Sequence, residues 1–275
     1  MPDDRWGMYM HSDGQCAEFG ADPLFDVRDR VVLVTGGTSG IGEIIARAFV
    51  QRGAVVIVTS RKAEACERVA VDLQQSGRCH AVAANLATND GIDAVGRFVA
   101  GITQKLDVLV NNAGATWGAA LGDFPEDGWD KTVDLNLKAP FFLTQALLPM
   151  LLRSASEVSP ARIINIASID GLSPPPFDSY AYAASKAGIL MLTRHLAKRL
   201  AGDHVLVNAI APGFFKTKMT DGVLRTQEAE VIGGIPLRRL GNASDIEGTV
   251  VFLASNASKY LTGTTICCDG GLSGT

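Results

Sequence analysis

Short apolar runs alternate with longer stretches of helical periodicity along most of the chain. Seven of these runs consist mainly of Val, Ile, Leu and Ala without alternating polar residues, which is typical of strands buried on both faces. The expected strands are Arg30–Thr35, Ala54–Ser60, His80–Ala84, Val108–Asn111, Ala161–Ala167, Leu206–Ala211 and Thr265–Cys268.

Helix-compatible stretches separate these runs, at Gly42–Gln51, Ala63–Gln75, Gly91–Thr103, Trp129–Ser154, Ser179–Leu200 and Asp245–Ala254. The regular strand–helix–strand rhythm predicts an α/β protein with a doubly wound, seven-stranded parallel sheet of Rossmann type, with helices on both faces. No linker or repeat divides the chain, so residues 23–275 are expected to form a single domain. Residues 1–22 are polar and are interpreted as a mobile N-terminal extension.

Three segments carry local conformational signals. Pro149 should end or kink the helix that opens near Trp129, and the run Pro174–Pro176 predicts a stiff extended loop. The stretch Gly213–Ile235 is less patterned, and it fits either a mobile flap over a pocket or an ordinary helical insertion.

Composition and charge exclude several classes of function. Hydrophobic residues make up 47% of the chain and charged residues 20%, and the net charge of −4 comes without a basic stripe for nucleic acid. Arg238 and Arg239 are interpreted as solvated or subunit-contact charges. No run of 18 apolar residues predicts a membrane span, and residues 1–22 lack a secretion signal, so a cytoplasmic location is expected. The five cysteines and four histidines show no ligand spacing, so no metal site is expected.

A glycine-rich turn follows the first expected strand and opens the first helix. Glycines there allow backbone N–H groups to approach a pyrophosphate at a helix N-terminus. The spacing Gly36, Gly40, Gly42 meets the commoner Gly-x-Gly-x-x-Gly fingerprint only in part. The candidate cofactor-binding residues of this turn are Gly36, Thr38, Ser39, Gly40, Ile41 and Gly42.

The end of the second strand indicates which dinucleotide is bound. An NAD site usually places an acid about 20 residues after the glycines, whereas Ser60 and Arg61 occupy this place here. A hydroxyl and a guanidinium suit a 2′-phosphate, so NADP(H) is predicted over NAD(H).

Tyr182 and Lys186 lie four residues apart in an expected helix, so both side chains share one face. An adjacent ammonium should lower the pKa of the phenol, which could then exchange a proton with a carbonyl oxygen or an alcohol. Tyr180 is off the helical face of Lys186, so Tyr182 is the candidate.

Taken together, these segments resemble the short-chain dehydrogenase/reductase family from Leu24 onward. The residues that carry the resemblance are Thr35–Gly42, Asn111–Gly114, Asn136, Ser168, Tyr182, Lys186, Asn208–Gly213 and Asp269–Gly271. Within the family, the stretches Asn111–Leu121 and Leu148–Ser156 are similar to bacterial β-ketoacyl reductases of the rhamnolipid-pathway type.

The resemblance implies a catalytic tetrad of Asn136, Ser168, Tyr182 and Lys186, with Asn136 distorting its helix and holding a water that feeds protons to Lys186. It implies further cofactor contacts at Asn112, Ala113, Gly114, Pro212, Gly213 and Thr217, besides Tyr182 and Lys186 themselves. Many members have Asp-Leu where this chain has Asn85 and Leu86, and the Asn85 amide oxygen can still accept from adenine.

These signals predict an NADP(H)-dependent enzyme that reduces a ketone to a secondary alcohol, with a 3-oxoacyl thioester or a related ketone as the small-molecule substrate. The alternatives are oxidation of a sugar acid, polyol or steroid alcohol, and a non-catalytic redox-sensing binding protein. Loop residues expected to receive an acyl chain or ring are Trp117, Ile169, Gly171, Phe177, Phe214 and Phe215, and Arg162 or Arg194 could face a carrier protein. The residues Ala139, Phe142, Ala183, Ala187 and Leu190 are expected to pack across subunits of a homotetramer or homodimer.

Overall fold

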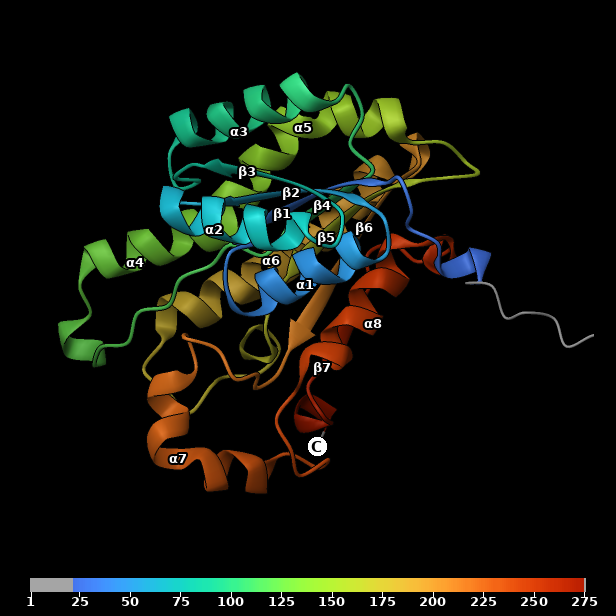
Figure 1. Ribbon diagram of the computed structural model, residues 1–275. Coiled ribbons are helices and arrows are strands. Elements are labelled where there is room, and N and C mark those ends of the chain that lie inside the picture. The colour runs from blue at the N-terminus through green and yellow to red at the C-terminus, as the bar shows by residue number, and fades with distance from the viewer. Residues whose placement is uncertain (1–21, 275) are drawn as a thin grey trace, which may run out of the picture.

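The fold is built around one parallel sheet of seven strands, in the order β3-β2-β1-β4-β5-β6-β7. The computed structural model describes residues 22–274, so the extension expected over residues 1–22 lies outside the described residues apart from Asp22. The predicted fold class, a doubly wound Rossmann-type sheet with helices on both faces, is confirmed (Figure 1).

The strands lie where the apolar runs predicted them, with small differences at the ends. They are β1 (Val31–Thr35), β2 (Val55–Ser60), β3 (Arg78–Ala83), β4 (Val108–Asn111), β5 (Ala161–Ile166), β6 (Val205–Pro212) and β7 (Thr265–Cys268). The largest difference is in β3, which begins at Arg78 because Arg78 and Cys79 continue the pairing with β2. A polar residue at the start of an edge strand does not interrupt the ladder, so hydropathy alone misses it.

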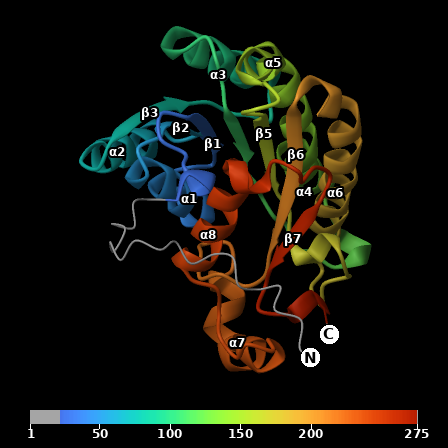
Figure 2. The same ribbon diagram turned by 90° about the vertical axis from the view of Figure 1, so that its right-hand side faces the viewer.

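Two layers of helices cover the sheet (Figures 1 and 2). Apolar residues of α1, α2 and α8 form one core with the sheet, and those of α3, α5 and α6 form the core on the other face. The helices are α1 (Gly40–Gln51), α2 (Ala63–Gln74), α3 (Asn89–Ile102), α4 (Glu126–Val133), α5 (Ala139–Ser154), α6 (Tyr180–Leu200), α7 (Asp221–Gly234) and α8 (Ala243–Ala254).

One long helix carries α4, a π-helical turn at Asp134–Lys138, and α5 without a break. The helix does not end at Pro149, as one reading of the sequence predicted, but continues to Ser154. Pro149 lies on the exposed side, where water can reach the carbonyl that loses its donor. By length and composition this helix could cross a membrane, but it packs through Leu143, Leu147 and Leu151 into the core of the sheet.

The segment Gly213–Ile235 contains a helical insertion, α7, which stands apart from both layers beyond the carboxyl ends of the strands (Figures 1 and 2). Leu224 is its one buried residue, and Gln227 has non-helical φ and ψ angles. Whether the helix moves as a flap stays a prediction.

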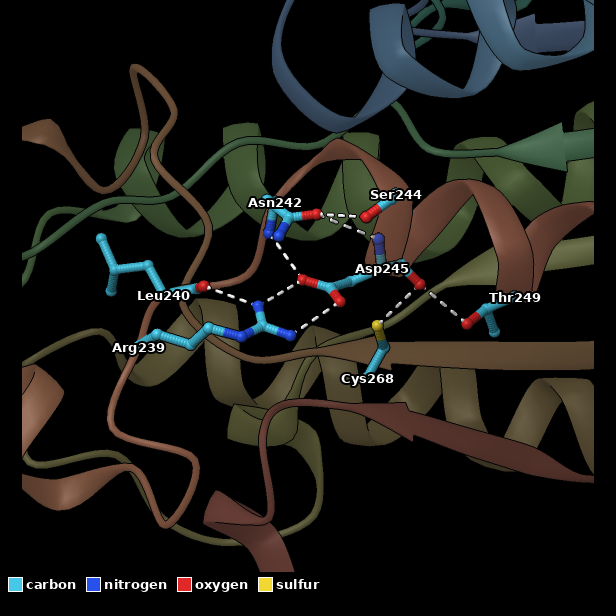
Figure 3. Close-up of polar contacts among 7 residues, drawn as sticks. All are labelled: Arg239, Leu240, Asn242, Ser244, Asp245, Thr249 and Cys268. Carbon is cyan, nitrogen blue, oxygen red and sulfur yellow. Dashed lines mark hydrogen bonds and ion pairs between the residues drawn. The ribbon is translucent and has the colours of Figure 1, made fainter.

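Polar contacts fasten the segment after α7 to the start of α8 (Figure 3). Arg239 Nη1 lies 2.6 Å from Asp245 Oδ2, and the Asp245 carboxylate also accepts from the backbone N–H of Asn242. Asn242 caps the helix in return, and the Cys268 thiol of β7 donates to the Asp245 carbonyl. Arg239 therefore makes an ion pair within the chain rather than being a freely solvated charge.

Candidate active site

The glycine-rich turn between β1 and α1 forms one wall of the candidate site. Gly40 has a φ of +54°, a left-handed conformation that favours glycine, and its missing side chain would face Thr217. A Cβ at Gly42 would lie 2.3 Å from the Gly36 carbonyl oxygen, so a side chain at this position is excluded. The turn therefore exposes the backbone N–H groups at the start of α1 to the adjacent cavity.

The turn is tied to the end of β4 by Thr35 and Asn112. The Thr35 hydroxyl accepts from the backbone N–H groups of Asn112 and Ala113, both at 2.9 Å. The Asn112 amide donates to the Thr35 carbonyl at 2.8 Å. Because β1 and β4 are the neighbouring strands at which the order of connection reverses, these contacts lie where ligands bind in such sheets.

Ser168, Tyr182 and Lys186 meet beside this turn. Ser168 follows β5, while Tyr182 and Lys186 lie one helical turn apart on α6, with Lys186 Nζ 5.5 Å from the centroid of the Tyr182 ring. Lys186 Nζ donates to the carbonyl oxygen of Ile166 at 2.7 Å. This contact fixes the ammonium group against the end of β5, with two of its three protons left for the cavity.

Asn136 lies in the π-helical turn, so the expected local distortion of its helix is present. Its side chain exchanges two hydrogen bonds with the backbone of Ala115, at 2.8 and 2.9 Å, and donates to the Ser185 hydroxyl at 3.0 Å. Asn136 is 2% exposed and does not line the cavity. Its contacts are therefore those of a residue that positions the loop after β4, and the water expected on Asn136 stays a prediction.

The pKa values of Tyr182 and Lys186 differ from what the sequence predicted. The pKa of Tyr182 is raised to about 12. Burial is the largest cause, a hydrogen bond with Ser168 acts in the opposite direction, and the Asp170 charge adds to the increase. Burial lowers the pKa of Lys186 to about 8, and Asp170 raises it. The prediction that the pKa of the phenol is lowered is thus wrong for the polypeptide by itself, because desolvation has the largest effect on this pKa and raises it.

Two cavities adjoin at these residues. The larger, of 470 Å³, is lined by the glycine turn, the end of β4 and the loop after β6, and the smaller, of 280 Å³, lies toward α7. Ser168, Tyr182 and Gly213 line both cavities. The Tyr182 phenol therefore lies where the two cavities meet, so a molecule bound in one cavity can contact a molecule bound in the other at this side chain.

Most residues predicted to contact the cofactor line the larger cavity. These are Gly36, Ser39, Gly40, Ile41, Gly42, Arg61, Asn112, Ala113, Gly114, Tyr182, Lys186, Pro212, Gly213 and Thr217. Thr38, Ser60, Asn85 and Leu86 do not line it. Leu86 is buried in the core, and the Asn85 side chain accepts from its own loop, at Ala87 N–H.

Several residues expected around the substrate lie elsewhere. Trp117 packs on Gly128 and lies under Lys131, and Gly171 packs on the backbone of Lys186, so neither lines the smaller cavity, whereas Ile169, Phe177 and Phe214 do. Phe215 is 3% exposed and lines the larger cavity. Arg162 cannot face a carrier protein, because it is 1% exposed and donates to the Ser255 carbonyl inside the fold.

Sequence reasoning missed several residues of the site. Lys131 and Lys218 line the larger cavity, Asp170 lines the smaller one, and Ser185 receives the Asn136 amide. Ser185 could have been found from its position within the helical stretch between Tyr182 and Lys186. Lys131 and Lys218 carry no local signal, because they reach the cavity only through the folding of distant loops.

The larger cavity fits a dinucleotide on the chemistry of its lining. It combines the glycine-rich turn at a helix N-terminus with four cationic residues, Arg61, Lys131, Lys186 and Lys218, and none of the described residues that line it is acidic. Fold and site together define an oxidoreductase of the nucleotide-binding Rossmann class.

Comparison with known sequences identifies the family. Residues 36–273 match the family described as Enoyl-(Acyl carrier protein) reductase, and the chain belongs to this family, within the short-chain dehydrogenases/reductases. The chain is similar to the rhamnolipids biosynthesis 3-oxoacyl-[acyl-carrier-protein] reductase of Pseudomonas aeruginosa, with 42% identity over 251 residues, 90% of this chain and 98% of the relative. The reductase FabG of Thermotoga maritima is 36% identical over 88% of this chain and 97% of its own length.

Comparison with solved structures identifies the same family. The NADP active-site complex of Pseudomonas aeruginosa RhlG matches with a TM-score of 0.88 and 41% identity, covering 92% of this chain and 99% of that one. A provisionally assigned NAD(P)-dependent gluconate 5-dehydrogenase from Beutenbergia cavernae, with bound NADP, has a TM-score of 0.85 and 34% identity over 92% of this chain and all of that one. The predicted family resemblance, including the similarity to the rhamnolipid-pathway reductases, is confirmed.

Proposed function

We propose that this protein is an NADP(H)-dependent ketoreductase that reduces a 3-oxoacyl thioester or a related ketone to the secondary alcohol. The observation that carries the proposal is the position of Tyr182 and Ser168 on the wall shared by a cationic cavity and an apolar one. The relatives named as 3-oxoacyl-[acyl-carrier-protein] reductases and the NADP complex of RhlG support the substrate class and the cofactor.

The reduced nicotinamide supplies the hydride when it is bound. Arg61, with Ser60 beside it, would meet a 2′-phosphate, and the N–H groups at the start of α1 would meet the pyrophosphate. Lys186 would bind the ribose hydroxyls with the protons that the Ile166 carbonyl does not take. Among the described residues, no acid lines the cavity to repel the added phosphate of NADP(H).

Ser168 and Tyr182 would act on the carbonyl oxygen of the ketone. Ser168 donates a hydrogen bond to this oxygen as it gains negative charge, which stabilises the transition state. Tyr182 then donates its phenolic proton, and with a pKa raised to about 12 the phenol carries this proton at neutral pH. Asn136 holds the loop at Ala115 and the Ser185 hydroxyl, so its part is to position α6 and this loop.

A second candidate function is oxidation of a sugar acid, polyol or steroid alcohol, which the gluconate dehydrogenase structure favours. The purified protein should be assayed with NADPH and NADH against acetoacetyl thioester, crotonyl thioester and 5-ketogluconate. The proposal expects oxidation of NADPH with the acetoacetyl thioester to be fastest. Faster turnover of 5-ketogluconate would favour the second function, and turnover of crotonyl thioester alone would replace ketone reduction by enoyl reduction.

We further propose that the protein works as a homo-oligomer in the cytoplasm. On the outer faces of α5 and α6, Phe142 is 38% exposed, and Ala187 is also exposed. Ala139 and Leu190 do not belong to this surface, contrary to expectation, because both are buried in the core of the same chain. The molar mass in solution, measured by light scattering, tests the assembly.

A further inference from the structure

The smaller cavity has a charge pattern opposite to that of its neighbour. Its walls are mainly apolar, with Ile169, Phe177, Phe214, Met219 and Val223 among them. Its two charged residues are both acids, Asp170 and Asp178, and within residues 22–274 no Lys, Arg or His lines it. The charged side chains that line this cavity are therefore acidic, and a ketone that enters it comes next to them.

The two acids differ in their surroundings. Asp178 is exposed and its carboxylate accepts the Tyr180 hydroxyl at 2.6 Å, so part of its hydrogen-bonding capacity is used. Asp170 is partly buried, and among residues 22–274 its carboxyl group makes no hydrogen bond or ion pair. A half-buried carboxylate without a partner acts on neighbouring charges more strongly than an exposed one.

The turn Ile169–Gly171 fixes Asp170 beside the reacting groups. The Asp170 backbone N–H donates to Ser168 Oγ at 3.1 Å. A Cβ at Gly171 would lie 2.5 Å from the carbonyl carbon of Lys186, so the turn is pressed directly onto α6. The Asp170 charge is also felt at Tyr182 and at Lys186, since it raises the pKa of both groups.

Building on the proposed function, we propose that Asp170 is a specificity-determining residue that excludes ketones bearing a carboxylate near the carbonyl and admits neutral ketones such as esters and thioesters. A carboxylate on the substrate would be placed in a poorly solvated cavity that already holds an unpaired carboxylate, and such a like-charge pair is unfavourable. The nearest cation, Lys186, lines the other cavity and donates to Ile166. Its charge lowers the pKa of the Asp170 carboxyl, but burial has the larger effect and raises that pKa, so the cation compensates the carboxylate only in part.

The test compares ethyl acetoacetate with acetoacetate, which lacks the ethyl group and carries the negative charge. The change in their ratio between wild type and variant isolates the effect of the Asp170 charge. For the wild type with NADPH, kcat/KM should favour the ester. The Asp170→Asn variant keeps the shape and removes the charge, so the ratio of ester to anion should fall about tenfold, through a rise in kcat/KM for acetoacetate. The matched variant Asp178→Asn should leave the ratio within about twofold, because this carboxylate is exposed and screened.

Binding of the products gives an independent readout. The dissociation constant of 3-hydroxybutyrate, measured by calorimetry, should decrease in Asp170→Asn, whereas that of its ethyl ester should change less. If Asp170→Asn does not fold, Asp170→Ser removes the same negative charge and serves as the second variant.

Two outcomes are separable. A ratio that stays constant in a folded, active Asp170 variant overturns the assignment of Asp170 and leaves the ketoreductase function intact. A wild-type protein that reduces none of acetoacetate, its ethyl ester and acetoacetyl thioester overturns the proposed function, and the assignment of Asp170 with it.

Discussion

The two cavities that share Tyr182 have opposite electrostatics and different origins. The larger one is cationic and formed largely by the glycine turn and the strand ends, whereas the smaller one is apolar and acidic and formed by loops and α7. The first follows from features common to many nucleotide-binding sheets. The second depends on the side chains of this chain, so cofactor choice and substrate choice can change independently.

The largest effect should come from the wall that both cavities share. Tyr182→Phe removes the proton donor and should lower kcat for ketone reduction about 10²- to 10⁴-fold, with the NADPH dissociation constant little changed. Steady-state kinetics and fluorescence titration measure the two quantities. Tyr180→Phe, on the same helix but 37% exposed, is the control and should retain activity. Undiminished turnover by Tyr182→Phe would contradict the role of Tyr182 as the proton donor.

A smaller effect is expected within the cationic cavity. Arg61→Ala removes the guanidinium beside the expected 2′-phosphate and should lower the preference for NADPH over NADH about 10- to 100-fold. The ratio of kcat/KM for the two cofactors measures the preference. Lys62→Ala removes a neighbouring exposed cation that does not line the cavity, so its ratio should stay near that of the wild type. Equal losses in both variants would show that general charge, rather than Arg61, selects the cofactor.

The pH dependence should reveal Lys186. The Tyr182 phenol stays protonated well above neutrality, but the Lys186 pKa of about 8 means that the ammonium charge is lost above that pH. Ketone reduction should therefore be level near neutrality and fall up to about tenfold per unit above pH 8. A profile that stays level to about pH 9.5 would contradict the pKa of Lys186.

The same shift has a consequence for stability. Unfolded lysine keeps its proton to a pKa of 10.5, whereas the native Lys186 loses it near 8. Between these values the unfolded chain binds more protons, so the unfavourable contribution of Lys186 to folding is full below pH 8 and fades as the pH rises toward 10.5. The difference in Tm between wild type and Lys186→Met should change over that window.

The smallest effect is expected at the rim of the cationic cavity. Lys131 is exposed, with Nζ 4.9 Å from the centroid of the Trp117 ring. Lys131→Met keeps the packing on the ring and removes the charge, so KM for NADPH should rise only about two- to fivefold. The difference should disappear at high salt, because exposed charges are screened. An effect that survives high salt would place Lys131 in direct contact with the cofactor.

The sequence predicted the parts of the molecule that depend on local pattern. The runs Val108–Asn111 and Thr265–Cys268 match the observed strands residue for residue. Val108–Asn111 is buried throughout, as its apolar continuity predicted, whereas the edge strand Thr265–Cys268 is only partly buried. The pairing of Tyr182 with Lys186 on α6 follows in the same way from helical spacing.

The features that the sequence did not predict depend on tertiary surroundings. The direction of the Tyr182 pKa shift is set by burial, which no spacing of residues expresses. Arg162 reads as a surface charge along the chain but is enclosed at the amino end of β5. Asp170 gains its importance only because the turn that carries it is pressed against α6 and opens into a cavity formed partly by α7.

The wide turn at Asp134–Lys138 has a consequence for how this helix can change in evolution. A π turn contains one residue more than an α turn, so the segments on either side are rotated relative to a regular helix by about 100°. Deleting a residue here would make a more regular helix, yet it would turn α4 away from its neighbours and withdraw the amide of Asn136 from Ala115. Length at this position is therefore constrained even where the identity of the residue is not.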